Sequence, residues 1–383
     1  MVHLALSVIF ALWLATPFVL YPLVMMWLAG RRGSKSADLT QEAWRPFVSV
    51  IVAAHNEESV IGERIQNLVD QDWPLANMEI IVASDASTDK TDAIVNSFGS
   101  PSIRLVRSEL RAGKTSAVQK AVSESRGEVL LFSDASTRWE PQCLRELVRA
   151  IAGPDVGCVS GRVLYERRSG GVASGFLLWQ KIAVALRQAE GQSGGLISVS
   201  GCIHGLRREL WKNLPLDIDP DLVLPALAAA SGLKTLYAAD AVAWELPRES
   251  VLVEFKARRR IAARAVHSGV WATRLALRSG STAYLARLTA HKWLRWTAWL
   301  ASLGLLATAA HGAEEFPVLR LLWYAQTLFY GLAVAGIAAA AAKARIGPLA
   351  TPAYWLLANL ALLVGSLDVL RKDHAAIWPT AER

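Results

Sequence analysis

The sequence predicts an α/β protein with a mostly parallel, Rossmann-like sheet flanked by helices and attached to a membrane at both ends of the chain. Three observations support this fold class. Short apolar runs alternate with helical patterns from residue 47 onward, as in strands joined by crossover helices. Polar clusters directly follow these runs. Hydrophobic residues make up 53% of the chain and charged residues only 19%, which is too apolar for an ordinary soluble enzyme.

The N-terminal segment Val2–Gly30 has no Asp, Glu, Lys or Arg, is long enough to cross a bilayer and is followed at once by Arg31-Arg32. A cleaved signal peptide would carry basic residues before its apolar core. We therefore expect an uncleaved anchor with the chain from residue 31 onward in the cytoplasm. Three apolar segments near Trp293–Ala310, Val318–Ala341 and Leu349–Leu370 predict about three C-terminal transmembrane helices.

The loops between these segments alternate in charge. The first, HGAEEFP, is acidic and the second, Lys343-Ala344-Arg345, is basic, as expected for an outer and an inner loop. The same alternation leaves Arg371-Lys372 outside, which the positive-inside rule disfavours. Either the last segment is re-entrant or the rule yields to the earlier charges.

The region between the membrane segments predicts four buried strands. They are expected at Phe47–Ala53, Glu79–Ala83, Ile103–Val106 and Gly127–Ser133. The polar clusters Asn56-Glu57, Asp85 and Asp134 come at strand ends, so they should meet at one edge of the sheet, where such folds bind ligands.

Two of these strand-edge features suggest phosphate binding. Asp134 is a short carboxylate at a strand exit, which suits a divalent cation that holds phosphates. The alternative is that it caps the helix near Pro141. Gly113-Lys114 opens a further helix and can cradle a phosphate.

The net charge of +8 comes from Arg248–Arg295, which holds eleven Lys and Arg against Glu249 and Glu254. These cations alternate with apolar residues at helical spacing, which predicts an amphipathic helix on anionic membrane lipids. Nucleic acid is not an expected partner of such a chain. The three cysteines lack CxxC spacing and the histidines lack HExxH spacing, so no zinc site is predicted.

Four sequence blocks occur in order between Phe47 and Trp139: VSVIVAAHNEE, EIIVASDASTDKT, RAGKTSAVQKA and GEVLLFSDAST. With them the chain resembles the family-2 glycosyltransferases, inverting enzymes with a GT-A fold that use nucleotide sugars. The resemblance continues more loosely to Arg264. The membrane segments make the architecture similar to the synthases of cellulose, hyaluronan or chitin-like oligomers.

The resemblance implies a donor site. Ala54, Asn56 and Glu57 would line the base and ribose pocket, Asp85 would bond the base or sugar hydroxyls, and Lys114 would approach the base or phosphates. The alternatives are that Asp85 and Asp89 are turn and cap residues and that Lys114 is an exposed lysine at a helix start. Asp134 matches the first acid of the Asp-x-Asp motif and would hold Mg²⁺ or Mn²⁺, whereas Ser136 replaces the second acid.

The resemblance also implies the catalytic and acceptor residues. Asp221 would be the base that takes the acceptor proton; it could instead be a helix N-cap, with Asp219 as the base. Arg259, Arg260 and Arg264 would neutralise the leaving diphosphate, or form a basic membrane-facing helix. The acceptor loop would comprise Ser200, Gly201, Cys202 and His204.

The expected function is transfer, with inversion, of a UDP-linked hexose or N-acetylhexosamine to a lipid-linked or glycan acceptor in envelope or exopolysaccharide synthesis. The alternative is a non-catalytic membrane scaffold or nucleotide-sugar sensor. The protein would lie in the inner membrane with its catalytic domain in the cytoplasm, and other envelope-polysaccharide assembly proteins could be partners. The expected divisions are an anchor (1–30), a linker (31–46), the GT-A domain (47–247), interface helices (248–292), C-terminal transmembrane helices (293–370) and a tail (371–383).

Overall fold

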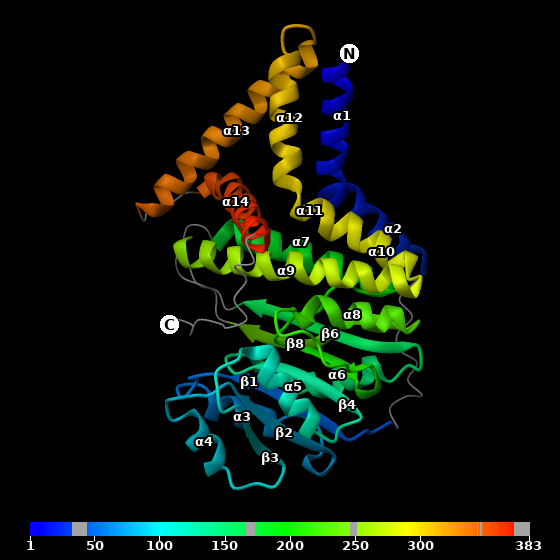
Figure 1. The fold of residues 1–383 in the computed structure, drawn as a ribbon, viewed down its shortest axis with the longest axis vertical. Coiled ribbons are helices and arrows are strands. Elements are labelled where there is room, and N and C mark those ends of the chain that lie inside the picture. Colours follow the sequence, from blue (N-terminus) through cyan, green and yellow to red (C-terminus); the bar gives the residue numbers. More distant parts are fainter. Residues whose placement is uncertain (33–43, 166–172, 246–250, 343, 345–346, 371–383) are drawn as a thin grey trace.

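The computed structural model describes residues 1–32, 44–165, 173–245, 251–342, 344 and 347–370. The molecule has three levels (Figure 1). A sheet with its flanking helices forms one end, long helices cross the middle, and steeply inclined apolar helices form the other end. Of the expected divisions, most of the linker (33–43) and all of the tail (371–383) lie outside the described residues.

The sheet confirms the predicted mostly parallel α/β architecture. Its strand order is β3-β2-β1-β4-β7-β6-β8-β5, and β1 pairs in parallel with β2 and β4. The short strand β7 runs antiparallel to both of its neighbours. The strands are β1 (Val48–Ala54), β2 (Met78–Ser84), β3 (Ile103–Arg107), β4 (Val129–Asp134), β5 (Arg138–Trp139), β6 (Val156–Tyr165), β7 (His204–Arg207) and β8 (Lys234–Glu245).

Helices cover both faces of this sheet, which explains why its central strands are apolar on both sides. Helices α3 (Ile61–Val69), α4 (Thr91–Ser97) and α6 (Cys143–Ile151) bury their apolar residues in the core of one face. Helices α5 (Lys114–Glu124) and α8 (Pro220–Ala230) do so on the other.

The strand register brings the predicted polar loops together. Ala54 at the end of β1 is the partner of Ser84 at the end of β2, and Ala53 is the partner of Asp134 at the end of β4. The loops that follow these three strands therefore leave the sheet at the same edge.

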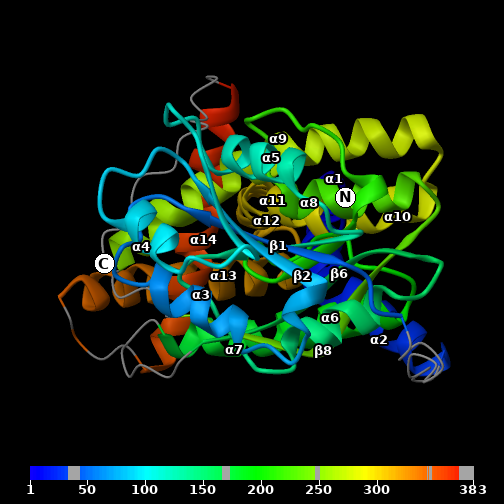
Figure 2. The ribbon, with the colours of Figure 1, turned by 90° about the horizontal axis from the view of Figure 1, so that it is seen from below.

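Two long helices separate the sheet from the apolar helices: α7 (Ala173–Gln192) and α9 (Val251–Ser279). Seen from below, they run along opposite sides of the molecule with the central strands between them (Figure 2). The predicted basic segment thus forms α9 at the level where the apolar helices begin, and after Gly280, which has a φ of 69°, it continues as the shorter helix α10 (Thr282–Leu288).

Among the residues that the structure describes, three helices are long and apolar enough to cross a membrane: Val2–Arg31, Pro317–Ala341 and Gly347–Val369. The prediction of about three C-terminal spans is therefore corrected to two. The first expected segment forms α12 (Ala298–Gly312), whose 15 residues fall short of the ~20 that a span requires. Helix α12 lies along α1 (Val2–Ala15), the first half of the N-terminal candidate span, where the ring of Phe10 fills the space beside Gly304.

A buried polar cluster joins the N-terminal segment to the middle level. The Tyr21 hydroxyl of α2 (Tyr21–Arg32) donates to Glu190 Oε1 over 2.6 Å, and His291 Nδ1 lies 2.8 Å from the same oxygen. All three residues are at most 6% exposed. Because a buried carboxylate needs its partners, this cluster fixes α2 against α7.

Tyr21→Phe removes one hydrogen bond to this buried carboxylate and should lower the free energy of unfolding by about 1–3 kcal/mol. Thermal unfolding of the detergent-purified protein measures the change. Tyr324→Phe, at an exposed position on α13 (Pro317–Ala341), is the matched control and should leave the melting temperature unchanged. Equal melting temperatures for Tyr21→Phe and the wild type would show that the cluster does not stabilise the fold.

Candidate active site

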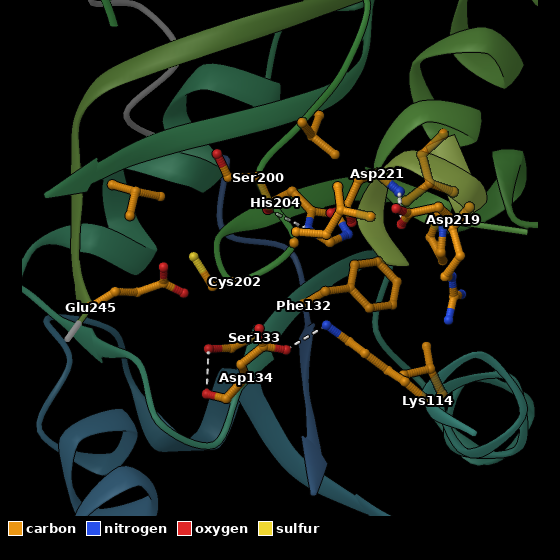
Figure 3. Close-up of a pocket in the computed structure, with 18 of the residues that line it drawn as sticks. Lys114, Phe132, Ser133, Asp134, Ser200, Cys202, His204, Asp219, Asp221 and Glu245 are labelled. Atoms are coloured by element: carbon orange, nitrogen blue, oxygen red, sulfur yellow. Dashed lines mark hydrogen bonds and ion pairs between the residues drawn. The ribbon is translucent and has the colours of Figure 1, made fainter. Parts of the chain in front are cut away.

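A cavity of about 390 Å³ opens at the carboxyl end of β4, where α5, α7, α8 and α9 converge. It is lined by charged and polar side chains from loops far apart in the sequence (Figure 3). The predicted site residues among them are Lys114, Asp134, Ser200, Gly201, Cys202, His204, Asp221, Arg260 and Arg264.

Asp134 and Lys114 form an ion pair in this cavity. Asp134 ends β4, and Lys114 begins α5 after Gly113, which adopts a φ of 94° that favours glycine. Burial lowers the pKa of Lys114, but the negative charges of Asp134 and Asp221 outweigh this effect and raise it overall. The cavity therefore holds a permanent positive charge between two carboxylates.

Asp221 lies at the start of α8 without capping it. The N-cap is Asp219, whose carboxylate accepts a hydrogen bond from the Asp221 backbone N–H over 3.3 Å. The Asp221 carboxylate is thus left to face the cavity. A Cβ on Gly201 would lie 2.6 Å from Asp221 Oδ2, so only glycine allows this close approach.

The surroundings of Asp221 raise the pKa of its carboxylate. Burial raises its pKa, and the nearby charge of Asp219 raises it further, against the opposing effect of Lys114. A carboxylate with a raised pKa is a stronger base than an exposed one, which is the property a general base needs.

The structure places Asp85 outside the cavity lining, beneath the start of α5. Its two carboxylate oxygens accept hydrogen bonds from the backbone N–H groups of Ala112 and Gly113, each over 2.9 Å. Asp85 is only 5% exposed. In this structure it therefore fixes the turn that presents Lys114.

The loop after β1 also lies next to the cavity rather than in its lining. Asn56 has a left-handed φ of 55°, and its Oδ1 accepts from Thr88 N over 2.8 Å. The Glu57 backbone N–H donates to Thr91 Oγ1 over 2.8 Å. These bonds join the loop after β1 to the segment that follows β2. Ala54 itself ends β1, where it pairs with Ser84 at the end of β2.

The three predicted arginines of α9 lie in two different places. Arg260 and Arg264 line the cavity, and Arg264 donates to the Ile218 carbonyl over 3.1 Å. Arg259 instead forms a two-pronged ion pair with Asp368 of α14 (Ala350–Leu370), over 2.6 and 2.8 Å. The structure thus places Arg259 against an apolar helix and not in the cavity.

The metal donors in the cavity are few. Within the described ranges, no three His, Cys, Asp or Glu side chains gather into a metal-binding group. Asp134 offers one partly exposed carboxylate, and Ser136, at the position of the missing second acid, is exposed. This donor set fits Mg²⁺ or Mn²⁺ only if phosphates of a ligand complete the coordination shell.

Residues 49–214 match the family described as "Glycosyl transferase family 2". This region is a family-2 glycosyltransferase domain. A "Beta-monoglucosyldiacylglycerol synthase" of Synechocystis sp. is 33% identical over 121 residues, which cover 30% of this chain and 25% of the relative. Its namesake from Nostoc sp. is 26% identical over 188 residues, which cover 46% of this chain and 40% of the relative. The match thus spans less than half of these relatives.

A solved structure shares the fold over almost the whole chain. The mannosyltransferase PcManGT from Pyrobaculum calidifontis, in complex with GDP-Man and Mn²⁺, superposes with a TM-score of 0.69 at 24% identity. The similarity covers 96% of this chain and 99% of that one. This comparison confirms the predicted GT-A fold, including the helices outside the sheet domain.

Arg64, which the sequence did not indicate, supports the candidate site from beneath β4. Arg64 is 2% exposed, stacks over Trp139 at 4.7 Å and donates to Ser133 Oγ over 2.8 Å, next to Asp134. The sequence feature that could have revealed Arg64 is its position as a charged residue within the apolar stripe of α3. Glu245 and Arg187, which also line the cavity, gave no signal, because only the tertiary fold brings them there.

Asp85→Asn should destabilise the ligand-free protein by about 1–3 kcal/mol, because an amide can accept only one of the two backbone hydrogen bonds that the carboxylate accepts. Thermal unfolding without nucleotide measures this loss. Asp240→Asn, at an exposed position of β8, should have no effect and serves as the control. Unchanged stability of Asp85→Asn would mean that Asp85 serves only a bound ligand.

Proposed function

We propose that this protein is an inverting membrane glycosyltransferase that transfers a hexose or N-acetylhexosamine, UDP-linked, to a lipid-linked or glycan acceptor. The observation that carries the proposal is that one cavity combines a half-buried carboxylate, Asp221, with the Asp134–Lys114 pair. Inverting transfer requires both a base for the acceptor and a positive charge for the leaving diphosphate. Relatives named for glucosyldiacylglycerol synthesis support a lipid acceptor.

In the proposed reaction, Asp221 takes the proton of the acceptor hydroxyl as the hydroxyl oxygen attacks the anomeric carbon. The new C–O bond forms as the bond from that carbon to the diphosphate oxygen breaks, with inversion. Lys114, Arg260 and Arg264 would hold the negative charge of the departing nucleoside diphosphate. Bound Mg²⁺ or Mn²⁺, held by Asp134 and the nucleotide, would add Lewis-acid stabilisation of that charge.

The membrane setting is part of the proposal. The three apolar helices would span the inner membrane and place residues 47–247 on the cytoplasmic side as the catalytic domain, with 248–292 at the interface. The cavity is lined partly by α7 and α9, the two long helices between the sheet and the apolar helices. An acceptor in the cytoplasmic leaflet would then meet a donor held over the sheet edge.

The purified full chain, given a panel of UDP- and GDP-sugars with a membrane lipid extract, should form a glycosylated product detectable by mass spectrometry. Asp221→Asn should lower transfer by at least about a hundredfold while keeping nucleotide affinity within about twofold. Asp217→Asn is the control, because that nearby carboxylate pairs with His267 at 2.9 Å and should leave transfer intact. Transfer by Asp221→Asn at the wild-type rate would contradict the assignment of Asp221 as the base. A wild-type protein that binds nucleotide but shows no turnover would favour the alternative function, a nucleotide-sugar sensor.

The raised pKa of Asp221 predicts a pH dependence. The base acts only when ionised, so kcat/KM should rise with pH through that raised value. Asp219→Asn keeps an N-cap acceptor but removes the neighbouring charge, which lowers the pKa of Asp221 and should shift the acidic limb to lower pH. Profiles of kcat/KM against pH for the wild type, Asp219→Asn and the control Asp217→Asn measure the shift. An acidic limb that does not move in Asp219→Asn would contradict the assignment.

A further inference from the structure

One ring nitrogen in the cavity lacks a hydrogen-bond partner. His204, the first residue of β7, is 3% exposed, and its Nε2 has no hydrogen-bond partner among the residues that the structure describes. Buried polar atoms in proteins are almost always paired, so an unpaired one in a binding cavity points to a bound group. The cavity lining includes this side chain, between Ser200 and Phe132 (Figure 3).

The surroundings of His204 fix which nitrogen carries the proton. Nδ1 lies 2.9 Å from the carbonyl oxygen of Ser200, and a carbonyl can only accept. Nδ1 therefore holds the hydrogen, and Nε2 presents a lone pair. Burial lowers the pKa of His204 to about 4, so the ring stays neutral near pH 7 and the lone pair remains available.

The ring cannot turn away to find another partner. It stacks on Phe132 with 4.8 Å between ring centroids, and its backbone pairs with Phe132 of β4 on one side and Ser160 of β6 on the other. The position of Nε2 is thus fixed, in a side chain that lines the same cavity as the Asp221 carboxylate. Because a lone pair can only accept, the group that satisfies it must be a hydrogen-bond donor.

We infer that His204 Nε2 accepts a hydrogen bond from a sugar hydroxyl in the cavity and makes His204 a specificity-determining residue. The inference rests on the proposed function, in which the cavity holds sugars. Asp221 takes the proton of the attacking hydroxyl, so His204 binds a different hydroxyl, on either the donor sugar or the acceptor. A sugar lacking that hydroxyl leaves the lone pair buried and unpaired and is selected against.

The test compares the wild type with His204→Phe, which keeps a stacking ring without a lone pair, and His204→Gln, which keeps an acceptor. UDP, GDP, UDP-glucose, UDP-N-acetylglucosamine and GDP-mannose are the binding probes, measured by calorimetry on the full chain in detergent. If the hydroxyl is on the donor, His204→Phe should bind the nucleoside diphosphate normally and lose about tenfold in affinity for the matching nucleotide sugar. If it is on the acceptor, donor binding should stay unchanged and kcat/KM for the acceptor should fall about tenfold.

In either case His204→Gln should recover part of the loss. His291→Phe is the matched control, because His291 is also buried but contacts Glu190 outside the cavity; it should not change the affinity ratio between nucleotide sugar and nucleoside diphosphate. Deoxy analogues of the bound sugar allow the same test on the wild type alone. The analogue that lacks the hydroxyl bound by His204 should show about tenfold lower affinity or kcat/KM.

Several outcomes overturn the inference. They are wild-type sugar recognition by His204→Phe, equal losses in His204→Phe and His204→Gln, or wild-type binding of every deoxy analogue. If the wild type binds nucleotide sugars and transfers sugar, and His204→Phe does so equally well, the role of His204 is contradicted and the proposed function stands. A wild type that binds none of the probes removes both.

Discussion

The site depends on one positive charge held between carboxylates. The ammonium of Lys114 contacts Asp134 and also stabilises the ionised form of Asp221, two acids that would otherwise repel each other in a poorly solvated cavity. Its position is set from behind, because Asp85 holds the backbone of Ala112 and Gly113. Parallel pairing of β1 and β2 in turn places Asp85 there. The electrostatics of the cavity thus follow from the strand register.

Asp219 and Asp221 divide two tasks that a single carboxylate could not perform together. A helix start needs an oxygen to accept a free backbone N–H, and Asp219 provides it. Asp221, two residues later, is left with its carboxylate toward the cavity and against Gly201. Their proximity has a second effect, since the charge on the capping residue raises the proton affinity of the other.

The sequence was sufficient for the features that local pattern encodes. The apolar runs predicted β1 to β4, and the positions of Asn56, Asp85 and Asp134 at strand ends predicted their common edge. It could not distinguish Arg259 from Arg260, because adjacent residues on a helix point about 100° apart and only packing decides which one meets α14. The span near Trp293–Ala310 was overestimated, since hydropathy does not reveal where α11 (Leu294–Trp296) ends and α12 begins.

Helix α9 carries arginines with two different attachments. Arg259 is bound to Asp368 near the end of an apolar helix, while Arg264, just over one turn away, touches Ile218 at the cavity wall. The close contact of Gly365 with the backbone of Arg259 leaves no slack between the two helices. A movement of α14 would therefore move α9 with it, and α9 also carries Arg260 and Arg264 at the cavity wall, so the position of the cavity cations depends on how this apolar helix is packed.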